Sequence, residues 1–308
     1  MSELTTSTII LDTTTMEKII NEPQWALDNQ EEFWSTYRAQ HLVRKWADNV
    51  KYDIPYEKWR VYIEGYAQLP LQDRQNHLLV KTANRILAAR EEFTEKAVAH
   101  DLSFLPEGVD LSVTIQFTAF VPPFAFAMED IVIDVASRYW NGNPEHILNL
   151  LVHELFHVGY SHYRTLQNEK GTIPDDLYSI LDNIVNEGIC TYVGHCALPL
   201  FPVEDERDYV MLENMSEVKR QFAETNAVLS QYGILDQEEL QKLSWDKGVM
   251  GRAYYVAGAY MAQEIDEKAG RQALIDVYSK GPISIIKLYN SLAEDGLTVE
   301  LPGERGVG

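Results

Sequence analysis

One twenty-residue segment, PEHILNLLVHELFHVGYSHY at 144–163, constrains the fold of this chain more than any other. Its apolar residues recur three and four positions apart, which predicts a helix with one face in the protein core. Asn143 is a candidate N-cap, and Pro144 suits the first helical position. The fold must therefore pack this helix while placing the polar residues of its HELFH sequence, at 153–157, where they are satisfied.

The HELFH sequence has the spacing of a metal site. His153 and His157 are four residues apart, so both imidazoles lie on one helical face and can reach one tetrahedral ion. Glu154 follows the first ligand, and its carboxylate can take a proton from a water molecule that the metal activates. Zinc lowers the pKa of such a water to about 7. We therefore predict one zinc ion per chain and a catalytic role for Glu154.

A zinc site of this kind needs a third protein ligand, and the sequence offers two candidates. Glu187 lies in NEGICTYVGH on the next predicted helix, from which a carboxylate could complete the site and leave one position for water. His162 is the alternative, because a glycine followed by a third histidine also occurs in zinc-binding patterns. Gly159 and His162 are each one residue too early for that pattern. Glu187 is the better candidate.

HELFH followed by NEGICTY resembles the gluzincin zinc peptidases, whose aminopeptidase branch carries HExxH and then NEGFAxY. The matching positions are Asn186, Glu187, Gly188 and Tyr192. The spacing differs, since 29 residues separate His157 from Glu187, and the polar segment around 163–178 is interpreted as an insertion. The resemblance covers about residues 113–260, and the chain is also similar to some uncharacterised zinc-dependent peptidase families. It implies a thermolysin-like catalytic core.

The same resemblance implies roles for two further residues. Tyr255, in YYVAGAY, matches a gluzincin tyrosine that donates a hydrogen bond to the oxyanion of the tetrahedral intermediate. The alternative for Tyr254 and Tyr255 is packing in an aromatic helix. AMED at 127–130 is similar to the aminopeptidase GAMEN edge strand, in which the glutamate binds the substrate amine. Glu129 would be that anchor here, or else a solvated carboxylate at a strand end.

Three other polar residues near the predicted ligands have weaker signals. His195 lies eight residues after Glu187, on about the same helical face, and could contact the site or simply pack. Asp182 and Asn183, one turn before the NEG sequence, could orient a ligand histidine through its free ring nitrogen.

Elsewhere the pattern is mainly helical. Apolar residues recur at helical spacing from about Thr15 to His100, and again over 177–198 and in most of the chain beyond. LSVTIQFTAF at 111–120 alternates, and DIVIDVAS at 130–137 is rich in β-branched residues, so both predict strands. We therefore expect an α+β fold, predominantly α-helical, with a small mixed sheet beside the HExxH helix.

We expect three regions that pack as one compact unit. They are an N-terminal helical region at 1–105, a catalytic core with the sheet and two metal-binding helices at 106–200, and a C-terminal helical region at 201–308. Cys190 and Cys196 lie six apart on one predicted helix, where they point to different faces and cannot form a disulfide. That spacing agrees with a reducing compartment.

Charge and hydropathy restrict the partners. The chain has 26 basic and 47 acidic residues and a formal net charge of −21, which argues against nucleic acid or an anionic membrane. No apolar stretch is long enough to span a bilayer, and the first twenty residues lack the features of a secretory signal. We expect a cytoplasmic protein. Nothing in the sequence predicts its oligomeric state.

Taken together, these features predict a zinc-dependent hydrolase, specifically a metallopeptidase that acts on a peptide or small amide. A zinc amidohydrolase or esterase that does not cleave peptides is one alternative. A non-enzymatic zinc-binding module is another. An iron or manganese carboxylate oxidase would need two ExxH pairs. Glu154 and His157 form one such pair, and the sequence contains no second.

Overall fold

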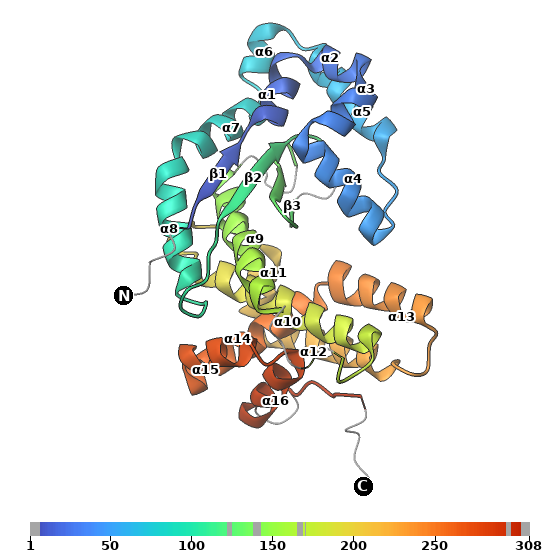
Figure 1. Ribbon diagram of the computed structural model, residues 1–308, viewed down its shortest axis with the longest axis vertical. Coiled ribbons are helices and arrows are strands. Elements are labelled where there is room, and N and C mark those ends of the chain that lie inside the picture. The colour runs from blue at the N-terminus through green and yellow to red at the C-terminus, as the bar shows by residue number, and fades with distance from the viewer. Residues whose placement is uncertain are drawn as a thin grey trace. The chain divides into compact units, whose positions relative to one another are not determined.

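The computed structural model describes residues 7–121, 125–137, 143–164, 169, 171–293 and 297–302. These residues are mostly helical, with one four-stranded sheet (Figure 1), so the α+β prediction is confirmed. The chain divides into two compact units, residues 1–99 with 110–158, and residues 100–109 with 159–308. The three-region division at 105 and 200 stays a prediction.

The first unit contains the mixed sheet. Its strands are β1 (Ile9–Asp12), β2 (Val113–Thr118), β3 (Ala125–Ala127) and β4 (Ile131–Asp134), in the order β1-β2-β4-β3. The pairs β1–β2 and β2–β4 are parallel, and β3 is antiparallel to β4. All four residues of β4 are buried, as expected for a β-branched central strand. β3 is therefore the edge strand that precedes Glu129.

Strand β1 was not expected from the sequence. It pairs with β2 in the register Ile9 to Val113, across about a hundred residues of chain. Ile9 and Leu11 are buried while Ile10 is 51% exposed, so the strand does alternate. Four residues are too short a run for that alternation to stand out.

The first unit also contains the N-terminal helices, as predicted. They are α1 (Thr14–Asn21), α2 (Pro23–Asp28), α3 (Gln30–Thr36), α4 (Arg38–Val50), α5 (Tyr56–Ala67), α6 (Leu71–Gln75), α7 (Leu78–Ala88) and the start of α8 (Arg90–Leu102). Their core contains a cluster of aromatic rings, in which Phe33 stacks on Trp59 and Trp34 meets Trp59 edge-on. Residues that recur at helical spacing in the sequence thus form the buried face.

The second unit is helical in its described residues. Its main helices are α10 (Asp175–Cys196), α11 (Arg207–Leu212), α12 (Met215–Ser230), α13 (Gln237–Leu243), the π-helix η2 (Ser244–Met250), α14 (Ala253–Ala269), α15 (Arg271–Tyr278) and α16 (Pro282–Leu292). Helix α14 contacts α10, α11, α12, α15, α16 and η2. The boundary between the two units falls inside α9 (Pro144–Arg164).

Two glycines bring α10 and α14 unusually close. A Cβ atom on Gly188 would lie 2.2 Å from the Cα atom of Gly258, and one on Gly258 would lie 2.1 Å from the carbonyl oxygen of Ile184. Neither position can accept a side chain without separating the helices. Gly188 directly follows Glu187, and Gly258 lies three residues after Tyr255. The close crossing therefore fixes the backbone positions of Glu187 and Tyr255 relative to each other.

Two smaller expectations concern cysteine and membrane helices. Cys190 is buried and Cys196 is half-buried, both on α10, and both are free thiols. None of the helices in the described part of the chain combines the length and apolar character that crossing a membrane requires.

Candidate metal centre

Helix α9 presents both histidines of the HELFH sequence. It begins at Pro144, and the side-chain oxygen of Asn143 accepts a hydrogen bond from the backbone N–H of Glu145 at 3.0 Å, which confirms the predicted cap. Leu151, Val152, Leu155 and Phe156 are fully buried. Because these four apolar residues fix the rotation of the helix about its axis, His153 and His157 must emerge together on its remaining face.

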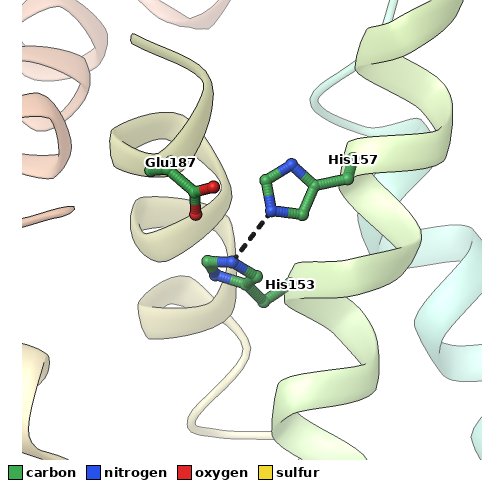
Figure 2. Close-up of side chains that lie close together, drawn as sticks. All are labelled: His153, His157 and Glu187. Atoms are coloured by element: carbon green, nitrogen blue, oxygen red, sulfur yellow. Dashed lines mark hydrogen bonds between the residues drawn. The ribbon is translucent and has the colours of Figure 1, made fainter. Parts of the chain in front are cut away.

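The two imidazoles are oriented toward one point. Their Nε2 atoms lie 3.1 Å apart, and the ring planes are inclined by 77° (Figure 2). Two nitrogens bound to one tetrahedral zinc ion at the usual bond length would lie about 3.4 Å apart. The observed separation therefore fits a shared ion with a shift of only a few tenths of an ångström. Without metal, one ring nitrogen can donate its proton to the other.

Glu187 supplies the third donor. One ligand atom each from His153, His157 and Glu187 lies within 4.8 Å of the others, and Figure 2 shows the carboxylate beside the two rings. Two imidazoles and one carboxylate are a donor set that suits zinc. Among the described residues, His162 is not part of this group, and its side chain is exposed.

Glu154 lies in the same turn of α9 as the first histidine. Only 6% of Glu154 and 8% of His153 is exposed. A cation held by the adjacent histidine would favour the ionised form of this poorly hydrated carboxylate. Its role as proton carrier stays a prediction.

With this geometry in view, comparison with known proteins identifies a family. The family model DUF5700, described as a putative zinc dependent peptidase, matches residues 14–296. The chain belongs to the DUF5700 family. No curated protein and no solved structure matches the chain. The family description and the three-donor group agree on zinc as the metal and support hydrolysis at the level of the family.

In this DUF5700 protein the two adjacent tyrosines at the start of α14 have different surroundings. Tyr254 is fully buried, and its hydroxyl lies 2.8 Å from the Ser244 Oγ atom. Its ring fills the space that a Cβ atom on Gly248 would need. Burial raises the pKa of Tyr254 to about 12. Tyr254 is thus a packing residue, whereas Tyr255 is partly exposed.

An arginine that the sequence analysis did not single out lies against Tyr255. The guanidinium carbon of Arg252 is 3.2 Å from the centre of the Tyr255 ring, and Asp208 accepts hydrogen bonds from the same guanidinium. Burial alone would lower the pKa of Arg252, but the charge of Asp208, its hydrogen bonds with the guanidinium and the charge of Glu187 raise that pKa overall. Arg252 is therefore in the electrostatic environment of the predicted third ligand. Its local sequence carries no signal for this arrangement.

Glu129 already binds an ammonium group of the chain. Both of its carboxylate oxygens accept from Lys45 Nζ at 2.9 Å, and Arg38 lies 3.4 Å from one of them. The hydrogen bond from Lys45 lowers the pKa of Glu129. The carboxylate is thus paired within its own unit, and a role as substrate-amine anchor stays a prediction.

The remaining residues of the predicted constellation lie on α10. The Tyr192 hydroxyl donates to Asp266 at 2.7 Å, so this residue of the NEG pattern joins α10 to the end of α14. His195 packs against the Tyr209 ring, with its Nε2 atom 3.7 Å from Glu213. Asp182 is only 1% exposed, and Asn183 is half-buried. The orienting role of Asp182 and Asn183 stays a prediction.

Proposed function

We propose that this DUF5700 protein is a zinc-dependent metallopeptidase of the gluzincin type. His153, His157 and Glu187 hold one zinc ion, Glu154 is the general base, and Tyr255 donates a hydrogen bond to the oxyanion. The substrate is a peptide or small amide, and the acidic surface makes nucleic acid and anionic membranes unsuitable partners. We place the reaction in the cytoplasm, in keeping with the free cysteines.

The observation that carries this proposal is the group of three donors within 4.8 Å. Two come from the HELFH sequence and the third from the NEG sequence, which together are the gluzincin pattern. Zinc held there supplies a Lewis acid that polarises the substrate carbonyl and acidifies water. The family description supports the same class of reaction.

Two side chains of the protein then act on the reacting groups. Glu154 takes a proton from the attacking water and passes it to the leaving amine, which must be protonated before the amide bond breaks. The Tyr255 hydroxyl donates to the carbonyl oxygen as negative charge develops on it. The Gly188–Gly258 crossing holds Glu187 and Tyr255 at a fixed separation within one unit, as such a reaction requires.

Substitution of Glu154 by glutamine tests the proposal. Glu154→Gln should keep its zinc and its thermal stability but lower the hydrolysis of a peptide library by at least about a hundredfold, since an amide cannot carry the proton. Glu145→Gln makes the same chemical change on α9 and removes only an exposed ion pair with Arg85, so it should remain active.

Simple esters and small amides are assayed beside the peptides. Cleavage of these alone would identify an amidohydrolase or esterase instead of a peptidase. Hydrolysis that is undiminished in Glu154→Gln would remove Glu154 from the mechanism and contradict the gluzincin assignment.

A further inference from the structure

Arg252 stands immediately before α14 in a left-handed backbone conformation, with φ of 68°. A residue with a large side chain is uncommon there and costs about 1 kcal/mol or more. Other contacts must therefore hold Arg252 in place. Residues with such a backbone are concentrated at functional sites.

Asp208 on α11 provides the first contact. Arg252 Nε lies 3.0 Å from Oδ1 and 3.1 Å from Oδ2, and Nη2 also donates to Oδ2. Asp208 is only 4% exposed. A guanidinium held by a buried carboxylate through two of its nitrogens has one permitted plane, so Asp208 fixes the orientation of Arg252.

Tyr255 provides the second contact. The guanidinium lies 3.2 Å from the centre of the Tyr255 ring, close enough for a cation–π interaction with the ring face. Because Asp208 fixes the plane of the guanidinium, the ring that stacks on it has a preferred orientation as well. A cation on the ring face also draws electron density from the phenol, which strengthens its hydroxyl as a hydrogen-bond donor.

Two other sets of contacts hold the backbone at the start of α14. Tyr254 is fixed by Ser244 and by contact with Gly248 of the π-helix η2, and Gly258 is fixed by Gly188 of α10. These contacts set the path of α14 but do not set the side-chain torsions of Tyr255. The stack with Arg252 acts on those torsions directly.

We propose that Arg252, anchored by Asp208, is a positioning residue that fixes the Tyr255 phenol so that its hydroxyl meets the oxyanion of the substrate. Arg252 acts through Tyr255 and does not itself touch the substrate. This role rests on the proposed function, because Tyr255 needs a fixed orientation only if its hydroxyl binds the oxyanion.

The first test does not depend on activity. Protein labelled with 3-fluorotyrosine is examined by ¹⁹F NMR, and the Tyr255 signal is identified by its loss in Tyr255→Phe. Arg252→Lys keeps the charge near Glu187 but removes the planar face and the paired hydrogen bonds. The Tyr255 signal should therefore shift and sharpen as the ring gains freedom. An unchanged Tyr255 signal in Arg252→Lys would overturn the proposal.

The chain offers a matched control. Arg271 also lies over an aromatic ring, 3.4 Å from the centre of Phe104, and is also held by an aspartate, Asp266. Arg271→Lys breaks an equivalent set of contacts elsewhere in the same unit. It should leave both the Tyr255 signal and the turnover rate unchanged, with a comparable change in melting temperature.

The second test is a double-mutant cycle on the zinc-loaded protein. Arg252→Lys should lower kcat about tenfold with KM within about twofold of wild type, and should lower it by less than about twofold when Tyr255 is already phenylalanine. Equal losses in both backgrounds would overturn the positioning role alone. Hydrolysis that does not depend on Glu154 would overturn the proposed function, and this role with it.

Discussion

Tyr254 and Tyr255 are adjacent in the sequence, yet the structure gives them opposite surroundings. Neighbouring residues on a helix point about 100° apart, so only one of the two can face a given site. Tyr254 is enclosed by Ser244 and Gly248, whereas Tyr255 is partly exposed against Arg252. The sequence left open whether both tyrosines pack, and the structure shows that Tyr254 does.

Removing one hydroxyl at a time tests this difference. Tyr255→Phe should lower kcat roughly a hundredfold with little change in KM, because the lost hydrogen bond forms only as charge develops on the oxyanion. Tyr254→Phe loses its bond to Ser244 and should cost about 1 kcal/mol of stability at unchanged kcat. Matched kinetics and urea unfolding measure both. Equal kinetic losses would return Tyr255 to a packing role.

A single site residue could be predicted from the sequence only where the residues around it form a recognisable pattern. The pairing of His153 with His157 follows from helical spacing, and Glu187 follows from its place in the NEG sequence. Arg252 could not be found this way, because its partner Asp208 is 44 residues away and neither residue belongs to a recognisable pattern. Side-chain partners brought together by helix packing leave no local signal.

At the scale of helices and strands, the apolar periodicity predicted the long helices around HELFH and NEG but did not predict the short strand β1. The helices around HELFH and NEG span 21 and 22 residues, which gives the apolar pattern many turns in which to appear. β1 has four residues and forms only because β2 supplies a distant partner. A 3.6-residue period likewise does not indicate the π-helix η2 or the left-handed backbone of Arg252.

The crossing of α10 and α14 makes a prediction about stability. Gly188→Ala or Gly258→Ala should each reduce the free energy of unfolding by about 3 kcal/mol, because the added methyl group meets backbone atoms that cannot move alone. Gly65→Ala is the control. Gly65 is also helical, has no atom within 4 Å of the added group, and should gain up to about 1 kcal/mol. Urea unfolding decides, and wild-type stability in Gly188→Ala would disprove the close crossing.

At the scale of the whole molecule, the sequence predicted the fold class and the small sheet because both follow from residue pattern. How the chain divides into compact units depends on which distant segments pack together. Residues 100–109, for example, group with the chain beyond 159 and not with their sequence neighbours. No local pattern reports such long-range packing.

The stability of the molecule should depend on pH through two buried carboxyl groups. Burial raises the pKa of Asp134 to about 7 and places that of Asp101 well above its usual range. A carboxyl group whose pKa is raised on folding contributes stability below its unfolded pKa, near 4, and loses that contribution as the pH rises through its folded pKa. The contribution of these two groups to the free energy of unfolding should therefore decrease as the pH rises from about 4 to about 7.

Replacing one of these aspartates with asparagine tests the direction of this pH dependence. Asp101 is fully buried, and neither of its carboxyl oxygens has a hydrogen-bond partner among the residues that the structure describes. Asp101→Asn should reduce the loss of stability with rising pH, measured by urea unfolding of metal-free protein. The exposed Asp48→Asn should leave the slope unchanged. A steeper slope in Asp101→Asn would show that this carboxyl group is not neutral in the folded protein.

The most direct test of the account is the zinc content of the purified protein after dialysis, measured by elemental analysis. Wild type should hold about one zinc per chain, and His153→Ala, His157→Ala and Glu187→Ala should each lose most of it, since removing one of three ligands weakens the site severely. His162→Ala should keep its zinc. Full zinc in the double variant His153→Ala with His157→Ala, or loss in His162→Ala but not in Glu187→Ala, would contradict the account.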